Sequence, residues 1–276
     1  MQSNNPALRR SAEFSANSSA QTGYTDPSSW GTGTPGQSGL QAPVATGGPM
    51  TVDSVVQKTA ISVGLVMIVA AATWAMTPAI DPDTNADLGP LIALMTIGSL
   101  GAFALSLVNS FKRVISPVLV LAFAALEGLA LGGLSKFFDA IYGDHIVMQA
   151  VIGTFAAFAG TLAAYKFFDI QVGKRFRTFV IAAMFGMVAL SLLEVVLSLF
   201  GSGLGIFGNG GAGLIFAIAG LVLGVFMLIL DFDFAEQLIA HGAPEREAWR
   251  VAFGLTVSLV WIYTNLLRIL AILNSD

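Results

Sequence analysis

The sequence lacks cysteine, and charged residues make up only 11% of its 276 positions. The absence of cysteine excludes disulfides, thiolate metal sites and cysteine nucleophiles. In a soluble domain about a quarter of all residues are charged, because its surface must be solvated. With 55% hydrophobic residues, this chain has too little polar material to cover a water-exposed surface. Most of the chain must therefore lie in lipid.

Histidine is also scarce, and the two histidines, His145 and His241, lie far apart in the sequence and outside any HExxH motif. This pattern argues against a His-rich metal centre. An intramembrane serine protease needs a Ser and a His within the membrane, and an aspartyl one needs an Asp on each of two helices. Neither set is present, so we do not expect an enzyme. The net charge of −4, without a basic patch, argues against nucleic acid as a partner.

The first part of the chain differs in composition from the rest. Residues 1–52 are rich in Ser, Gly, Thr, Pro, Gln and Asn. Such a segment buries too little apolar area to offset the entropy lost on ordering. No apolar run follows Arg9 and Arg10, so the segment is not a secretory signal. We therefore predict a disordered polar tail over residues 1–52 and a membrane domain over residues 53–276.

Beyond the tail, long apolar runs recur with short polar, Pro-containing or Gly-containing segments between them. Each run reaches the roughly 20 residues that cross a hydrocarbon core of about 30 Å. The predicted helices are Lys58–Thr77, Gly89–Phe111, Ser116–Phe138, Ile146–Phe168, Thr178–Phe200, Gly211–Leu230 and Val251–Leu273. The pattern predicts an all-α membrane protein with a bundle of seven transmembrane helices. A re-entrant segment would reduce the seven crossings to six.

Basic residues are distributed unevenly between the two sets of predicted loops. With the tail in the cytoplasm, eleven of the thirteen Lys and Arg face the cytoplasm, and only Lys136 and Arg268 fall toward the other side. Positively charged loops stay on the cytoplasmic side of a membrane. We therefore expect a multi-pass plasma-membrane protein with a cytoplasmic N-terminus and an outer C-terminus.

Two acidic residues lie inside predicted spans, where a charged side chain costs at least ~2.5 kcal/mol. Glu127 lies near the middle of the third helix, and Glu194 lies nearer the end of the fifth. Each acid has two readings. It either faces an internal cavity, where it binds a cation or carries a proton, or it is a protonated acid hydrogen-bonded to a neighbouring helix.

Asp231 and Asp233 follow the sixth apolar run at the predicted cytoplasmic boundary. Two residues apart on a helix correspond to about 200°, so at most one of these side chains can face a pathway. The alternative is an ordinary pair of acids at a helix end in the headgroup region.

The first outer loop carries four oxygen-bearing side chains at alternate positions, namely Asp81, Asp83, Asn85 and Asp87. The alternation is that of an EF-hand calcium loop. The match fails because Ala86 stands where the sharp turn needs Gly, and Ile92 stands where the bidentate Glu belongs. The remaining hypothesis is a weak electrostatic collector of cations at an outer mouth.

Four stretches of the chain are similar, in order and spacing, to a known family. They are Ala124–Gly133, Gln149–Phe155, Leu228–Phe234 and Trp261–Leu270. Together they resemble the transmembrane Bax inhibitor motif family in its bacterial branch, and the likeness runs from about Lys58 to Leu273. The resemblance implies a seven-helix bundle in which the last helix is central and ringed by the others.

The resemblance also implies a pH-sensitive calcium leak that is governed by a pair of aspartates. Asp231 looks like the aspartate at the end of helix six. Ser258 stands ten residues before Arg268, where the family pattern places the second aspartate. A proton-sharing carboxylate pair cannot form from these two residues. Arg113 or Lys112 corresponds to a basic partner at the end of helix two.

These observations predict a pH-sensitive leak channel for calcium or other cations. The candidate ion-pathway or pH-sensing residues are Asp231, Glu127, Asp233, Glu194 and Arg113. The surrounding partner is the lipid bilayer, Ca²⁺ or protons would be the transported ions, and we expect no resident cofactor. The alternative is a non-transporting membrane protein that acts through protein partners in stress response or envelope quality control.

Overall fold

The computed structural model describes residues 48–80, 88–143, 145–168 and 170–275. Within these ranges, seven helices are long and apolar enough to cross a membrane, which confirms the predicted all-α architecture. They are α2 (Val52–Met76), α3 (Gly89–Phe111), α4 (Pro117–Tyr142), α5 (Ile146–Phe167), α6 (Lys174–Leu199), α7 (Gly211–Ala240) and α8 (Ala248–Leu273), with a short 3₁₀ turn, η2 (Glu245–Glu247), before α8. Most of the predicted tail and the predicted cation collector (Asp81, Asp83, Asn85 and Asp87) lie outside the described residues.

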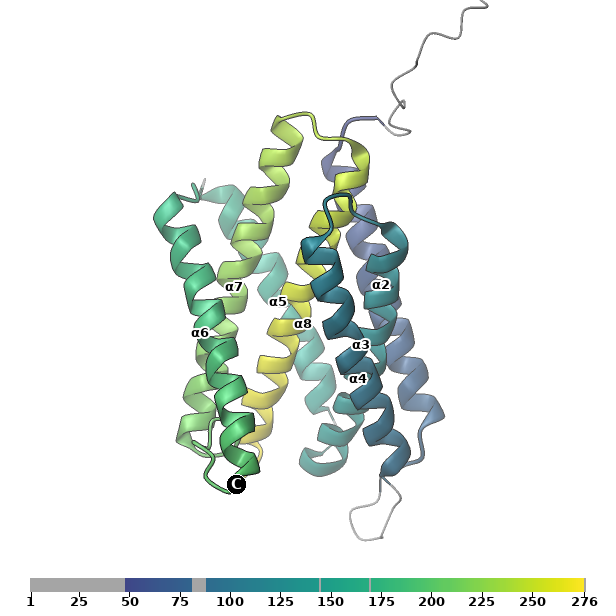
Figure 1. Cartoon of the computed structure of the whole chain (residues 1–276), viewed down its shortest axis with the longest axis vertical. Helices are drawn as coiled ribbons and strands as arrows, with labels where there is room; N and C mark the ends of the chain where they lie inside the picture. Colours follow the sequence, from purple (N-terminus) through teal and green to yellow (C-terminus); the bar gives the residue numbers. More distant parts are fainter. Residues whose placement is uncertain (1–47, 81–87, 144, 169, 276) are drawn as a thin grey trace, which may run out of the picture. The chain divides into compact units, whose positions relative to one another are not determined.

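Helix α8 is the centre of the bundle, as the family resemblance implied (Figure 1). It packs against α2, α4, α5 and α7, while α3 packs mainly on α4 and α6 mainly on α7. In α8, 56% of the most apolar stretch is buried, the largest share among the seven helices. The side chains of α8 therefore decide how the surrounding helices approach one another.

Close approach between helices depends on small residues at two places. A Cβ atom on Gly128 of α4 would lie 2.7 Å from the carbonyl oxygen of Val66 in α2, and Gly132 packs against Ala70 in the same way. In α7, Gly224 lies against Ile262 of α8. This spacing of small residues four apart lets the backbones of membrane helices come into contact.

The chain enters the bundle through a short strap, residues 48–50, that pairs with the loop between α7 and α8. The backbone N–H of Met50 donates to the carbonyl of Ala243 at 2.8 Å, and that of Glu245 donates to Gly48 at 3.0 Å. The Met50 side chain is only 2% exposed. The strap therefore forms part of the hydrophobic core near the starts of α2 and α8.

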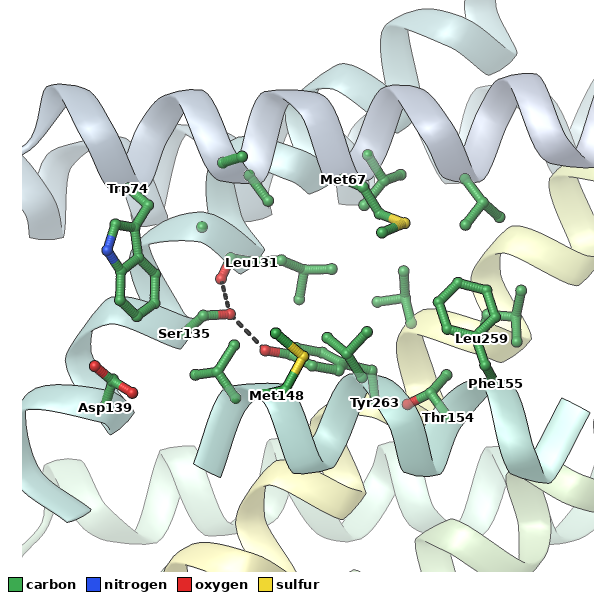
Figure 2. A pocket seen from close by; sticks show the side chains of 18 of the residues that line it. Met67, Trp74, Leu131, Ser135, Asp139, Met148, Thr154, Phe155, Leu259 and Tyr263 are labelled. Carbon is green, nitrogen blue, oxygen red and sulfur yellow. Dashed lines mark hydrogen bonds between the residues drawn. The ribbon is translucent and has the colours of Figure 1, made fainter. Parts of the chain in front are cut away.

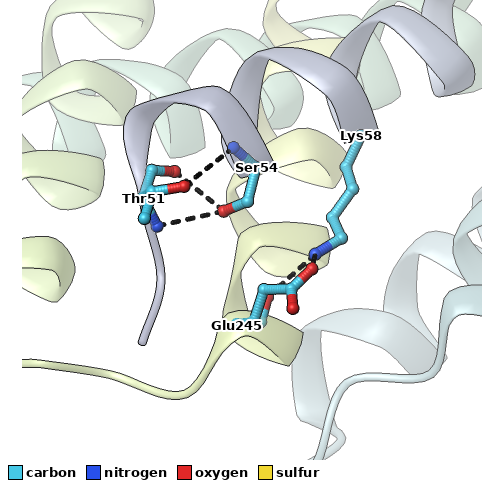
Figure 3. Close-up of polar contacts among 4 residues, drawn as sticks. All are labelled: Thr51, Ser54, Lys58 and Glu245. Carbon is cyan, nitrogen blue, oxygen red and sulfur yellow. Dashed lines mark hydrogen bonds and ion pairs between the residues drawn. The ribbon is translucent and has the colours of Figure 1, made fainter. Parts of the chain in front are cut away.

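Helix α2 begins with a capping box (Figure 3). Thr51 and Ser54 exchange hydrogen bonds between side chain and backbone, which satisfies N–H groups that have no partner inside the helix. One turn later, Lys58 donates to the Glu245 carboxylate at 2.7 Å. These contacts fix the start of α2 against the loop that precedes α8.

Helix α7 continues ten residues past the predicted end at Leu230, and reaches Ala240. The prediction that Asp231 and Asp233 end the helix is therefore wrong, and both acids lie inside it. The sequence suggested an exit because polar residues follow Leu230, but Phe232 is buried, and Phe234, Ala235, Leu238 and Ile239 pack against the same core. Apolar packing on one face carries the helix onward while polar groups occupy other faces.

The bundle has two ends that differ in charge. We refer to the end where α2, α4, α6 and α8 begin as the entry end, and to the other as the far end (Figure 1). Among the described residues, nine of eleven Lys and Arg belong to the entry end, and the other two are Lys136 and Arg268. Lys136 donates to the carbonyls of Trp74 and Thr77 at 2.8 and 2.5 Å, so its ammonium group caps the C-terminal end of α2.

Candidate functional site

The clearest polar contact between membrane-spanning helices joins Asp231 of α7 to Ser258 of the central helix. The Ser258 hydroxyl donates to Oδ2 of Asp231 at 2.5 Å. One turn earlier on α8, a Cβ atom at Gly254 would lie 2.8 Å from Oδ1 of Asp231. Small residues four apart on α8 thus leave room for the carboxylate and provide its hydrogen-bond donor.

No basic side chain forms an ion pair with Asp231 in the part of the chain that the structure describes. Asp231 is also among the residues that line a cavity of about 360 Å³ between α6 and α7, while its carboxyl group is directed toward Gly254 and Ser258 of α8. The other side chains of that cavity are apolar: Val180, Ile181, Met184, Phe185, Val188, Met227 and Leu230. An acid in this position is costly for a membrane helix, and such groups are retained where they serve a function.

Asp233 faces a different helix from Asp231, as the 200° separation on a helix requires. Arg177 of α6 donates to Oδ2 of Asp233 at 2.9 Å, and Gln237 donates to the same oxygen at 2.7 Å. Asp233 is therefore neutralised by a protein partner that ties α6 to α7. Of these two acids, only Asp231 lines the cavity between α6 and α7.

Glu194 holds the loop between α6 and α7 at the far end of the bundle. The backbone N–H groups of Leu204 and Gly205 donate to its two carboxylate oxygens at 2.7 and 3.0 Å. The side chain is buried, and the residue is only 4% exposed. The hydrogen-bond partner of Glu194 is therefore the loop that follows α6. The reading in which Glu194 forms a hydrogen bond with a neighbouring helix is wrong.

Arg268 holds the same loop from the central helix. Its guanidinium donates to the carbonyl of Ile206 at 2.6 Å and lies over the rings of Phe207 and Phe216, at 5.5 and 5.9 Å from their centroids. Cation–π contacts of this kind strengthen as water is excluded. Glu194 and Arg268 together fix the far-end loop through its backbone.

Glu127 lies on the side of α4 that faces α8. It follows Phe123 by one helical turn, and the Phe123 ring contacts Phe253 of α8 with centroids 5.0 Å apart. Glu127 is partly buried, and no hydrogen bond or ion pair of its carboxyl group is found among the described residues. Glu127 is thus a second acid beside α8, and unlike Asp231 it has no hydrogen-bond partner in the part of the chain that the structure describes.

Arg113 is exposed, and the structure does not pair its side chain with Asp231. Its backbone carbonyl accepts a hydrogen bond from Arg250 at 2.8 Å, and that of Lys112 accepts a longer one at 3.4 Å. These bonds join the loop between α3 and α4 to the start of α8. The candidate residues therefore separate into Asp231 and Glu127 beside α8, and three residues that make other contacts.

Two features of this site were not identified from the sequence. Gly254 was not singled out, although Gly254 and Ser258 have the spacing that marks helix contacts in membranes. The pairing of Asp233 with Arg177 was also missed, since their separation of 56 positions in the chain leaves no local pattern. The site can present two carboxylate oxygens and one hydroxyl, which are the oxygen ligands that calcium prefers. Water would have to complete the coordination of such an ion.

The sequence pattern of the family described as Bax inhibitor 1 like matches residues 5–275, which includes every described helix of the bundle. A search of curated proteins finds no matching relative.

Proposed function

The chain belongs to the Bax inhibitor 1-like family of multi-span membrane proteins, and from this premise we propose that it is a pH-sensitive leak channel for calcium or other cations. Members of this family are generally non-enzymatic membrane proteins. In the proposal, Asp231 is the residue that senses both the cation and the proton. Glu127 is a second acid on the route.

The observation that carries the proposal is the Asp231 carboxyl group, which lies between membrane helices without a basic partner among the described residues. The group accepts one hydrogen bond from Ser258, and Asp231 is the one charged residue among those that line the cavity between α6 and α7. A structural acid would be expected to resemble Asp233 or Glu194, whose oxygens are occupied by an arginine or by backbone N–H groups. In the proposal, the cation binds Oδ1 of Asp231, because the one hydrogen bond found for this carboxyl group among the described residues is accepted by Oδ2.

The pH dependence follows from the charge on this group. When Asp231 is ionised it attracts a cation, and the Ser258 hydroxyl keeps Oδ2 directed toward α8. When Asp231 is protonated the attraction is lost and the hydrogen bond weakens, because bonds to ionised acceptors are about twice as strong as neutral ones. Cation flux should therefore fall as the pH is lowered.

We also propose that the entry end faces the cytoplasm, in the plasma membrane. The support is the distribution of charge, since nine of eleven described Lys and Arg belong to that end. Basic residues in short loops are retained on the cytoplasmic side during insertion. The far-end loop that Glu194 and Arg268 fix would then lie on the outer side.

The test is reconstitution of the full chain into liposomes that contain a calcium-sensitive dye. We expect a calcium influx at about pH 7 that decreases several-fold by about pH 5, as Asp231 binds a proton. Empty liposomes and liposomes with a heat-unfolded sample are the controls. An absence of calcium flux at every pH would contradict the proposal.

The alternative function, a non-transporting protein that acts through protein partners, is favoured by one observation. Ser258 stands where the family pattern places the second acid, so the proton-sharing pair is missing. In that case Asp231–Ser258 serves only to join α7 to α8. The same liposomes distinguish the two functions, because the alternative predicts no flux from a folded, thermally stable protein.

A further inference from the structure

A second and larger cavity lies on another side of the central helix, away from Asp231. It has a volume of about 570 Å³ and is bounded by α2, α4, α5 and α8. Figure 2 shows Met67 and Trp74 of α2 across the cavity from Met148 and Phe155 of α5. This volume is within the range of about 300–1,000 Å³ that binding pockets for small molecules occupy.

The cavity is open on the side that faces the bilayer. Its floor is buried, since Leu131, Leu259 and Tyr263 are 7%, 7% and 8% exposed. Its rim is exposed, since Met67 and Met148 are 47% and 61% exposed. Both rim residues belong to membrane-spanning helices, so the molecule that meets the opening is lipid rather than water.

The interior of the cavity offers almost nothing to a polar ligand. The hydroxyls of Thr154 and Thr256 donate to the carbonyls one turn earlier on their own helices, at 2.7 Å each. The Ser135 hydroxyl donates to Leu131, so the Tyr263 hydroxyl donates to Ser135 at 2.6 Å (Figure 2). The hydrogens of all four hydroxyls are therefore used within the protein, and the remaining walls are hydrocarbon.

Polar side chains gather at one end of the cavity only. Trp74, Asp139 and His145 lie there, near the end of α2, the end of α4 and the start of α5. Figure 2 shows Trp74 and Asp139 at the same end, away from Phe155. Because all three helix ends belong to the far end of the bundle, this end of the cavity lies at headgroup level, where Trp is enriched in membrane proteins.

The length of the cavity matches one leaflet of a bilayer. Along α2 it extends from Val63 to Trp74, which at 1.5 Å per residue is about 16 Å. Half of a hydrocarbon core of about 30 Å is about 15 Å. A hydrocarbon chain that starts at headgroup level beside Trp74 would thus end near the middle of the membrane, beside Val63.

We propose that this cavity binds one acyl chain of a membrane phospholipid from the far-end leaflet, with the headgroup beside Trp74, Asp139 and His145. The acyl chain inserts between α2 and α5 and rests on α4 and α8. The proposal goes beyond the cation leak and does not depend on it, so an absence of calcium flux would leave it standing.

The test uses a phosphatidylethanolamine that carries a photoreactive diazirine near the end of one acyl chain. The full-length protein is reconstituted into vesicles of phosphatidylethanolamine and phosphatidylglycerol that contain this probe. After illumination, the labelled peptides are identified by mass spectrometry. We expect several-fold more labelling around Leu259 and Phe155 than on the lipid-facing side of α6. Equal labelling of both regions would show annular lipid only and would overturn the proposal.

A matched pair of substitutions on α5 sharpens the test. Val151 lines the cavity, while the adjacent Ile152 is 61% exposed and is not among the lining residues. We expect Val151→Phe to fill the cavity and to lower labelling of Leu259 several-fold, whereas Ile152→Phe leaves it unchanged. The same labelling in both variants would contradict the proposal.

A measurement on the unaltered protein guards against a folding defect in the variants. Native mass spectrometry of the purified protein should show one phospholipid that remains bound when increasing detergent has removed all others. Ala70→Leu, which fills the cavity from α2, should remove that lipid while thermal unfolding shows a folded protein. A wild-type protein that releases its last lipid together with the rest would contradict the assignment.

Discussion

Glu194 and Asp231 are carboxylates on neighbouring helices of the same bundle, but their surroundings differ. Glu194 accepts hydrogen bonds from two backbone N–H groups of the loop that follows its own helix. Asp231 accepts one hydrogen bond from a hydroxyl group of the central helix, and the residue borders a cavity. The number and kind of hydrogen-bond donors therefore distinguish an acid that fixes a loop from one that has remaining capacity for an ion.

The position of each acid relative to the central helix adds to this difference. Glu194 acts at the far end, where Arg268 of α8 holds the same loop by its backbone. Asp231 contacts α8 directly through a side chain that can lose or gain a proton. A change of charge at Asp231 thus alters the α7–α8 contact itself, whereas a change at Glu194 alters a connection outside the helices.

The largest expected effect is on stability, at Glu194. Glu194→Leu removes the acceptor of two backbone N–H groups of an exposed loop, and each lost hydrogen bond costs about 0.5–1.5 kcal/mol. We expect a loss of about 1–3 kcal/mol in the free energy of unfolding, measured by thermal unfolding in detergent. Calcium flux per folded protein should not change.

Glu194→Gln is the control for that substitution, because its amide oxygen can still accept one of the two hydrogen bonds. We expect it to lose about 1 kcal/mol only. If Glu194→Leu were as stable as the wild-type protein, the distinction between a loop-fixing acid and an ion-binding acid would not hold.

A smaller effect is expected at Ser258, where the second aspartate of the family pattern is missing. Ser258→Asp would place two carboxyl groups in contact. Two carboxyl groups so close cannot both ionise easily, because their negative charges repel each other. The variant should retain a proton at higher pH, so the calcium flux should begin to fall about one pH unit above the wild-type value. The measurement is the flux into dye-loaded liposomes over a pH series.

Ser258→Asn provides a neutral side chain of similar size for comparison. Its pH profile should follow that of the wild-type protein, because it adds no titrating group. Identical profiles for Ser258→Asp and Ser258→Asn would show that position 258 has no part in the pH response.

Much of the architecture follows from hydrophobic patterning alone. Apolar runs of sufficient length predict the seven helices, because a membrane demands that backbone hydrogen bonds be satisfied within each segment. Reliance on hydrophobic patterning also explains why the end of α7 was mispredicted. Patterning reads Asp231 and Asp233 as an exit, whereas the structure gives them partners on α8 and α6, so the helix continues to Ala240.

The candidate site was only partly predictable. Counting from Arg268 identified Ser258 as the residue opposite Asp231, and the structure shows the two in hydrogen bond contact. The loop contacts of Glu194 could not be foreseen, since they involve backbone N–H groups whose directions depend on the fold of the loop. The lipid-facing cavity was equally hidden, because it depends on how α2 and α5 diverge around α8.

The most direct test of the account compares two acids that are two positions apart on α7. Asp231→Asn removes the charge beside Ser258, while Asp233→Asn removes the charge that pairs with Arg177. In dye-loaded liposomes at about pH 7, we expect Asp231→Asn to lower the calcium flux by roughly tenfold and to abolish its pH dependence, whereas Asp233→Asn retains both. Equal flux and an unchanged pH dependence in Asp231→Asn would contradict the role assigned to Asp231.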